Sequence, residues 1–435
     1  MIFKRKLSNL ELPHDKATTN VASVPIAPPS EVLLPMTMHS GSPAEPVVNV
    51  GDHVCIGQLI AREEGRNSSP VHATISGTVT AIEPYGNAKA IRIQSDGKME
   101  VSPDVRPPEV HDLDSFLASV RESGIVGLGG AAFPVWAKLD AVRRGPVKTV
   151  LINGAECEPY LTGDNRTMVE HSDLIVKGID LLKTYLKSEK FIIGIEKNKP
   201  EAIAHLTEVF SNDPAVEVLP LDCTYPQGAK QMLLYNATGK VVEAGQRLAS
   251  LEVIIINVTS LAKVAKFMET GMPLVDRCVT VDGSAVKEPK NLVVPVGTSV
   301  GYILEQAGGL KEEAGKIVMG GPMMGHTVTD LKEPIVKATG GILAFNEKDA
   351  KVLEPTACIH CGRCVNACPM GLNPVAFSKA MEMEDDEARF ELLTREQVKV
   401  CIECGACSYV CPAHRQLVKH NIDGKGFLRK YQAAK

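Results

Sequence analysis

The stretch "KTVLINGAECEP" (residues 148–159) joins a run of apolar residues to an acidic loop. Uninterrupted aliphatic residues of this kind are typical of a strand that is buried on both faces. Three similar runs, "KFIIGIEK", "AVEVLPL" and "LEVIIINVTS", follow along the chain, and segments with helical spacing such as "HSDLIVKGIDLLKTYLK" lie among them. The alternation predicts an α/β domain over residues 112–267 with a largely parallel sheet.

The segments before this domain have a different pattern. Residues 31–100 consist of short apolar runs between turn residues, which predicts an all-β unit. The runs "VNVGDHVCIGQLIA" and "VHATISGTVTAIEP" resemble the two halves of a biotinyl/lipoyl-type barrel-sandwich, although the lysine that such domains modify is absent. Residues 1–30 are rich in Pro and Ser and are expected to form an extended arm, while the Pro-rich residues 101–111 predict a linker.

The segments after the α/β domain predict two more units. Residues 268–345 return to short strands with Gly-rich turns, as in "RCVTVDGSAV" and "GKIVMGGPMMG", around one helical piece, "SVGYILEQAGG". This pattern favours a small α+β unit of the β-grasp kind. Residues 350–435 carry most of the cysteines and predict a helical, ferredoxin-like domain. The fold class is therefore a multidomain combination of α/β and α+β units.

Composition excludes several classes of function. The chain has 435 residues, a net charge of −5 and only 4% aromatic residues, so neither its charge nor its stacking capacity favours nucleic-acid binding. A membrane helix needs about 18 consecutive apolar residues, and no apolar run of the sequence is that long. The N-terminus lacks the apolar region of a secretory signal. We therefore expect membrane contact to be peripheral or to occur through partner proteins.

Eight of the twelve cysteines form two identical runs, in "ACIHCGRCVNACPMG" (357–371) and "VCIECGACSYVCPAH" (400–414). Both read C-x2-C-x2-C-x3-C-P, the spacing of bacterial ferredoxins that hold two 4Fe–4S clusters, in which the fourth cysteine of each run ligates the other cluster. The spacing predicts cluster site 1, made of Cys358, Cys361, Cys364 and Cys411. It predicts cluster site 2, made of Cys368, Cys401, Cys404 and Cys407.

Other interpretations of the cysteines fit less well. Paired C-x2-C runs also bind zinc, but two complete four-cysteine runs with a trailing proline favour iron–sulfur clusters. The remaining cysteines, Cys55, Cys157, Cys223 and Cys278, are scattered and are expected to be small buried hydrophobic residues. Two clusters of this kind carry single electrons and do not transform a substrate. Another part of the chain must therefore exchange electrons with the substrate.

A glycine loop and the acidic loop are the candidates for that part. The stretch "GIVGLGGAAFPVWAKL" (124–139) does not open a helix directly after a strand, so it is a poor Rossmann fingerprint. Its glycines nevertheless allow a ligand to approach the backbone closely, Phe133 is suited to stack on a ring, and Lys138 is suited to meet a phosphate. Asn153, Glu156 and Glu158 follow a buried strand, where α/β domains usually bind ligands.

The glycine loop and "NGAECEP" together resemble the flavin-binding subunit of respiratory complex I. Over essentially the whole chain, the order of barrel, flavin-type core, "GGPMMG" segment and two ferredoxin runs is similar to the C subunit of the Rnf family of ion-translocating ferredoxin:NAD+ oxidoreductases. The resemblance implies an FMN site, contacts to NAD(H), and exchange of hydride between NAD(H) and FMN. Single electrons would then pass through the two clusters to or from the other Rnf subunits, at the cytoplasmic side of the cell membrane.

The resemblance also implies which residues bind each cofactor. Gly129, Gly130 and Lys138 would belong to the loop that holds FMN. Asn153 and Glu156 would be the polar residues beside the flavin. Phe133 and Glu158 would face the nicotinamide dinucleotide. Tyr225, Gly228 and Lys230 in "YPQGAK" match a later segment of the site, and Asn257 and Thr259 match residues that reach the FMN phosphate or ribityl chain.

Five positions depart from the pattern of the complex I protein. The arginine of that pattern is replaced by Leu128, and two of its glycines are replaced by Ala132 and Cys157. Two of its glutamates are replaced by Ala229 and Lys230. FMN binding is therefore better supported than the pose of the dinucleotide. Three alternatives stay open: a cobalamin reductase-like flavin and iron–sulfur protein, a non-enzymatic module that only conducts electrons, and a scaffold subunit with structural zinc.

Overall fold

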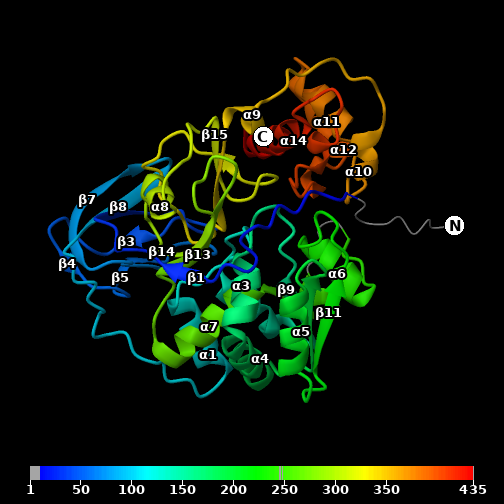
Figure 1. Cartoon of the computed structure of the whole chain (residues 1–435). Coiled ribbons are helices and arrows are strands. Elements are labelled where there is room, and N and C mark those ends of the chain that lie inside the picture. The colour runs from blue at the N-terminus through cyan, green and yellow to red at the C-terminus, as the bar shows by residue number, and fades with distance from the viewer. Residues whose placement is uncertain (1–9, 244–245, 247, 435) are drawn as a thin grey trace.

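The structure is a computed structural model that describes residues 10–243, 246 and 248–434. The first nine residues of the expected N-terminal arm lie outside this described part. The four predicted kinds of unit are present, and Figure 1 shows the β-rich N-terminal unit at the left, the helical cysteine-bearing unit at the upper right and the α/β domain at the bottom. The predicted fold class is thus confirmed.

The N-terminal unit is a sandwich of two antiparallel sheets, one with the order β2-β8-β7-β4 and one with the order β3-β5-β6. Its core is a cluster of aliphatic side chains and methionines that includes Leu34, Met36, Ile60 and Ile91. The strands are β2 (Glu31–Pro35), β3 (Glu45–Pro46), β4 (His53–Val54), β5 (Leu59–Arg62), β6 (Val71–His72), β7 (Gly77–Tyr85) and β8 (Ala88–Ser95).

The α/β domain is built on an all-parallel sheet with the order β11-β10-β9-β12. The four apolar runs of the sequence form these strands because both faces of the sheet are covered by helices. The strands are β9 (Thr149–Gly154), β10 (Lys190–Glu196), β11 (Val216–Leu221) and β12 (Val253–Asn257).

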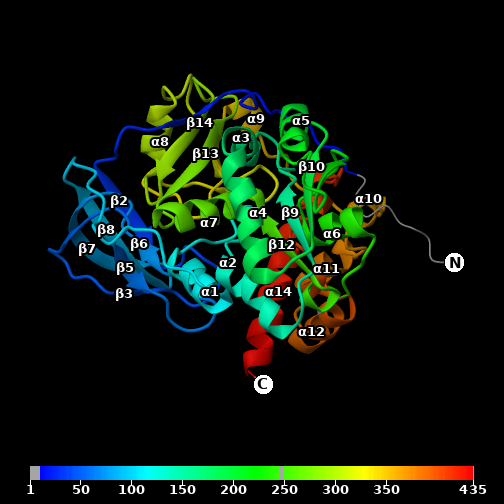
Figure 2. The same cartoon turned by 90° about the horizontal axis from the view of Figure 1, so that it is seen from below.

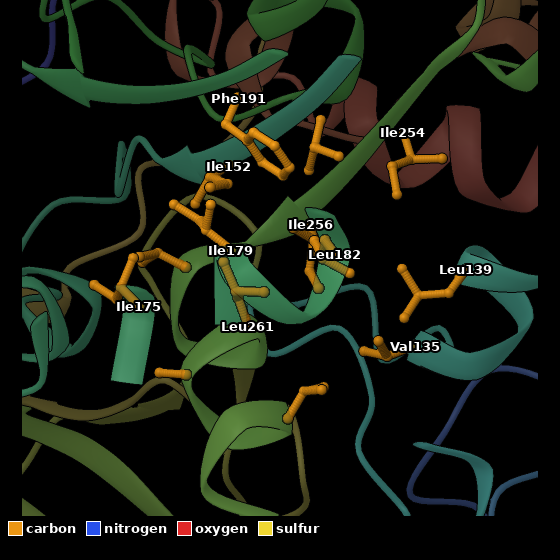
Figure 3. Packing of buried hydrophobic residues seen from close by; sticks show 14 of the residues in the cluster. Val135, Leu139, Ile152, Ile175, Ile179, Leu182, Phe191, Ile254, Ile256 and Leu261 are labelled. Atoms are coloured by element: carbon orange, nitrogen blue, oxygen red, sulfur yellow. The ribbon is translucent and has the colours of Figure 1, made fainter. Parts of the chain in front are cut away.

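Helices α1, α4, α5 and α7 pack on one face of this sheet and α6 on the other. Figure 3 shows the contact on the first face, where Ile179 and Leu182 of α4 meet Leu261 of α7 below Ile152 and Ile256 of the strands. The helices are α1 (Leu113–Glu122), α2 (Val135–Leu139), α3 (Gly163–Glu170), α4 (Ser172–Leu186), α5 (Pro200–Val209), α6 (Lys230–Thr238) and α7 (Val258–Thr270). Short 3-10 turns cover Asp140–Arg144 and Leu248–Leu251.

The third unit is a mixed sheet with the order β1-β14-β13-β17-β15-β16. Its edge strand β1 comes from the N-terminal arm and pairs in parallel with β14, a strand that the aperiodic arm sequence does not predict. The buried Asn291 of β14 holds the arm by donating from Nδ2 to the carbonyls of Thr18 at 2.9 Å and Val21 at 3.0 Å. The elements are β1 (Ser23–Pro25), β13 (Asp276–Asp282), β14 (Lys290–Pro295), α8 (Val300–Gln306), β15 (Lys316–Met319), β16 (His326–Thr327) and β17 (Gly341–Phe345).

The C-terminal unit is helical and surrounds the cysteine runs. Phe377 of α11, Leu393 of α12 and Leu428 of α14 form its small apolar core. Seen from below, α14 runs past α11 and α12 toward the C-terminus (Figure 2). The helices are α9 (Glu347–Ala350), α10 (Arg363–Ala367), α11 (Pro374–Met381), α12 (Asp386–Arg395), α13 (Ala406–Tyr409) and α14 (Leu417–Ala434), with a 3-10 turn over Val398–Val400.

A buried lysine joins three of the units. Lys337, which follows β16, is 1% exposed and donates from Nζ to the carbonyls of Pro70 at 2.6 Å and Gly124 at 2.8 Å. Pro70 belongs to the β-sandwich and Gly124 opens the glycine loop, so the loop is fixed relative to both β units. Burial lowers the pKa of Lys337 to about 7.

The close approach of α4 and α7 yields a stability prediction. A Cβ added at Gly178 of α4 would lie 2.6 Å from Cγ of Leu261. We expect Gly178→Ala to destabilise the protein by about 1–3 kcal/mol through overpacking, despite the better helix propensity of alanine. Gly426→Ala in α14 is the matched control, because nothing lies within 4 Å of that added Cβ.

Thermal unfolding of both variants checks this prediction. Gly426→Ala should leave the unfolding midpoint unchanged or raise it slightly, because alanine restricts the unfolded chain more than glycine does. An unfolding midpoint for Gly178→Ala at or above that of the unaltered protein would contradict the packing argument.

Candidate functional site

The glycine loop is held by contacts on one side and leaves Gly129 and Gly130 open to solvent on the other. The N–H of Leu128 donates to Ser260 Oγ at 2.9 Å, and the buried Arg277 of β13 donates from Nη2 to the Leu128 carbonyl at 3.1 Å. Gly129 and Gly130 are exposed, and Gly130 has φ of +106° with open space where a Cβ would point. A ligand can therefore lie directly against this backbone.

Two lysines border the loop without a counter-charge. Lys138 in α2 is half-buried, and among the described residues its Nζ has neither a hydrogen-bond acceptor nor a carboxylate partner. Burial lowers the pKa of Lys138 to about 8, and the positive charge of Lys230 at the start of α6 contributes to this shift. A cation in this condition fits an anionic ligand group, such as the phosphate of FMN.

The carboxyl ends of β9 and β12 bring two asparagines side by side, Asn153 and Asn257, which are register partners in the sheet. Asn153 donates from Nδ2 to the Gly228 carbonyl at 2.9 Å, which ties the "YPQGAK" loop to the strand end. Glu156 accepts from the N–H of Asp164 at 3.0 Å, at the start of α3. The sheet edge thus gathers the loops that the sequence singled out, in the position typical of α/β ligand sites.

Asp164 is a site residue that the sequence interpretation missed. Its carboxylate accepts from Asn257 Nδ2 at 2.7 Å and from Thr259 Oγ1 at 2.6 Å. Burial raises the pKa of Asp164 to about 6, and the neighbouring carboxylate of Glu156 contributes to this shift. The polar run "GDNR" (residues 163–166), which follows the acidic loop, is the sequence feature that could have identified Asp164. In this structure Asn257 and Thr259 are therefore engaged by Asp164.

Two predicted site residues lie on the cysteine side of the domain instead. Glu158 accepts from the Met323 N–H at 3.0 Å, under the "GGPMMG" loop, and burial raises its pKa. Tyr225 is buried, and its hydroxyl donates to the carbonyl of Cys404 at 2.8 Å.

Phe133, another predicted site residue, stays within the glycine loop. It is half-buried there, and its carbonyl accepts from the Gly127 N–H at 2.8 Å.

All four cysteines of predicted cluster site 2 line one hollow with about 340 Å³ of empty space, including its mouth. Its other walls are mostly apolar, and they include Met370, Leu372, Ile402 and Val418. The N–H of Leu372 points to Cys368 Sγ at 3.4 Å and the N–H of Glu403 to Cys401 Sγ at 3.3 Å. Four thiols around an apolar space with backbone donors aimed at sulfur fit a 4Fe–4S cluster.

The cysteines of predicted cluster site 1 lie nearer the surface. Cys364 is buried, Cys358 and Cys411 are half-buried, and Cys361 is exposed. Burial raises the pKa of Cys364, and the proximity of Cys411 and Cys358 raises it further. The fold thus brings Cys411 from the second run toward the first run. Within the described chain, no three His, Cys, Asp or Glu side chains converge on the position of a single metal ion.

Four family models match consecutive parts of the chain. They are described as the RnfC barrel sandwich hybrid domain over residues 8–98, the Nuo51 FMN-binding domain over 120–266, the SLBB domain over 278–327 and the 4Fe-4S dicluster domain over 354–422.

Several curated proteins are similar over most of the chain. The C subunit of the Na(+)-translocating ferredoxin:NAD(+) oxidoreductase complex of Acetobacterium woodii is 40% identical over 83% of this chain and 84% of its own length. The C subunit of the proton-translocating ferredoxin:NAD(+) oxidoreductase complex of Clostridium ljungdahlii is 42% identical over 82% of this chain and 79% of its own length. The C subunit of the ion-translocating oxidoreductase complex of Pectobacterium carotovorum is 37% identical, and the match covers 86% of this chain but 51% of that protein.

Among solved structures, a chain of an NAD+-reducing [NiFe]-hydrogenase in the H2-reduced state is similar, with a TM-score of 0.51 and 17% identity. The match covers 75% of this chain and 67% of that chain. At this identity the similarity supports the fold and carries no functional argument.

The unpaired Lys138 yields a prediction about flavin binding. We expect Lys138→Met to weaken FMN binding about ten- to hundredfold, because a charge-assisted hydrogen bond contributes about 1.5–3 kcal/mol. Since the pKa of Lys138 is about 8 in the free protein, the lysine loses its charge as pH rises through this value. FMN affinity should therefore fall above about pH 8 in the unaltered protein, and this fall should be absent from the variant.

Fluorescence titration of flavin-stripped protein across pH measures both effects. Lys332→Met, at an exposed lysine outside the glycine loop, serves as the control and should bind FMN normally. Equal affinity and equal pH dependence in Lys138→Met and the control would contradict a contact between Lys138 and the flavin phosphate.

Proposed function

The chain belongs to the family of the C subunits of ion-translocating ferredoxin:NAD(+) oxidoreductase complexes, and on this basis we propose that it exchanges electrons between NAD(H) and the other subunits of such an assembly. One FMN and two 4Fe–4S clusters would carry the electrons. The observation that carries the proposal is the hydrogen bond from Tyr225 to Cys404, at 2.8 Å, because it joins the flavin-type loops directly to a cluster site.

The glycine loop, the lysines and Asn153 would hold the flavin. Gly129 and Gly130 offer exposed backbone, Lys138 offers an unpaired cation, and Asn153 fixes the Gly228 loop beside them. When bound, FMN supplies the conversion between a hydride and single electrons. The protein contributes placement, and no side chain is needed as a general acid or base.

The dinucleotide would lie on the open side of the glycine loop, where Phe133 is half-buried and Gly129 and Gly130 are exposed. Ala229 and Lys230 make this face more positive than the two glutamates of the complex I pattern would, which favours an anionic ligand. Glu158 is engaged by the Met323 N–H, so we assign it to the contact between domains and not to the nicotinamide.

Cluster site 2 would be the first to exchange electrons with the flavin. Besides the bond from Tyr225, a Cβ added at Gly405 would lie 2.7 Å from the Met323 carbonyl, so the second cysteine run packs tightly against the "GGPMMG" loop. Cluster site 1 is more exposed at Cys361. We propose the order FMN, cluster site 2, cluster site 1 and then a partner protein of the assembly.

Membrane attachment would also depend on partner proteins. Among the described residues, no helix has both the length and the apolar composition needed to traverse a bilayer. We propose that the chain sits at the cytoplasmic face of the membrane, where electrons reach it through the other subunits of the assembly.

Anaerobic purification followed by iron and flavin counting tests the cofactor content. We expect one FMN and the iron of two 4Fe–4S clusters per chain, and bleaching of both chromophores on titration with NADH. Zinc with little iron would contradict the proposal in favour of the scaffold alternative. Absence of flavin, with no NADH-dependent dye reduction after FMN addition, would favour the non-enzymatic alternative.

Two serine variants test the crossed ligand sets and the proposed order. Cys364→Ser should remove the signal of cluster 1 from the electron paramagnetic resonance spectrum of the reduced protein and leave cluster 2 reducible by NADH. Cys404→Ser should remove cluster 2 and leave cluster 1 reducible by dithionite but slow to respond to NADH. Rapid NADH reduction of cluster 1 in Cys404→Ser would contradict the order, and loss of neither signal in Cys364→Ser would contradict the ligand assignment.

A further inference from the structure

Helix α14 places the amide of Asn421 against the sulfurs of cluster site 2. Asn421 is 2% exposed and lines the same hollow as the four cysteines. Its Nδ2 lies 3.5 Å from Cys401 Sγ and 3.9 Å from Cys407 Sγ, within hydrogen-bonding range of sulfur. Its Oδ1 is buried and has no hydrogen-bond partner in the described part of the chain. The sulfurs are thus the only described partners of this side chain.

The next turn of α14 strengthens this arrangement. Lys425 lies four residues after Asn421, on the same face of the helix. Its Nζ donates to the carbonyl of Cys401 at 2.7 Å and pairs with Glu403. The helix therefore fixes both the backbone of Cys401 and the amide that points at its sulfur.

The internal repeat of the domain supplies a comparison for Asn421. Ser378 of α11 stands at the same distance after Cys368 as Asn421 does after Cys411. Ser378 is equally buried, but its hydroxyl accepts from Arg415 Nη2 at 2.8 Å. In the described structure, the cysteine sulfurs of cluster site 1 receive no hydrogen bond from any side chain, and Cys358 Sγ has one backbone donor, the His360 N–H at 3.4 Å. The two cysteine runs match, whereas the donors around them do not.

We propose that Asn421 raises the reduction potential of cluster 2 and has no corresponding effect on cluster 1. An N–H aimed at a ligating sulfur stabilises the negative charge that builds on the cluster when it takes up one electron, so the reduced state is favoured. The inference rests on the proposed cluster assignment. It adds that α14 favours the reduced state of the cluster next to the flavin through a side-chain donor that its repeat partner lacks.

Redox titration followed by electron paramagnetic resonance tests the inference. Asn421→Leu keeps the side-chain volume and removes the donor, and we expect the midpoint potential of cluster 2 to fall while that of cluster 1 stays unchanged. Measuring the change again with Cys364→Ser added isolates the signal of cluster 2. Asn421→Ala provides a second variant that also removes the donor but has a smaller side chain, in case leucine interferes with folding. Ser378→Ala is the matched control and should leave the potential of cluster 2 unchanged.

The outcomes separate this inference from the proposed function. Full iron content with an unchanged midpoint of cluster 2 in Asn421→Leu would overturn the role of Asn421. Loss of cluster 2 in both Asn421 variants would also overturn it, because the residue would then be needed for assembly and not for the potential. A failure of the unaltered protein to show two clusters would instead contradict the proposed function itself.

Discussion

The contact between Tyr225 and the second cysteine run is the constraint on which the arrangement of the domains depends. The Tyr225 hydroxyl donates to the carbonyl of Cys404, while its own N–H donates to the carbonyl of Leu10 at 2.7 Å. One residue of the flavin-type domain thereby holds both the N-terminal arm and a cluster site. Leu12 and Met323 pack around the same tyrosine, so the contact between the two domains is buried.

Contacts from residues distant in the sequence also fix the conformation of the glycine loop. Its rear is fixed by Arg277 from the β-grasp unit, and its first residue, Gly124, accepts from Lys337. Both side chains are buried, and Lys337 Nζ donates to three oxygen acceptors, those of Ser69, Pro70 and Gly124. Removing a cation from water is costly unless such acceptors surround it, so the β units and the loop must dock together. The open face of the site is therefore a product of domain packing and not of the loop alone.

Local patterns predicted much of this molecule. Apolar runs located strands β9 and β12, whose carboxyl ends carry Asn153 and Asn257, and cysteine spacing predicted the gathering of Cys368 with Cys401. Strand β1 was not predictable because its pairing depends on Asn291, far away in the chain. Asp164 was missed for a related reason. A lone aspartate near a helix start is usually a solvated cap, and only tertiary structure places it under Asn257 and Thr259.

Asn421 shows why a repeat in sequence need not be a repeat in chemistry. The two cysteine runs share spacing and trailing proline, so spacing alone makes the clusters equivalent. Their helices differ, since α14 offers an amide where α11 offers a hydroxyl already engaged by Arg415. Cluster site 2 is also the more enclosed, with Cys404 and Cys407 buried, whereas Cys361 of site 1 is exposed. Burial alone disfavours the extra negative charge of a reduced cluster, so a buried donor such as Asn421 is what would keep the flavin-side cluster reducible.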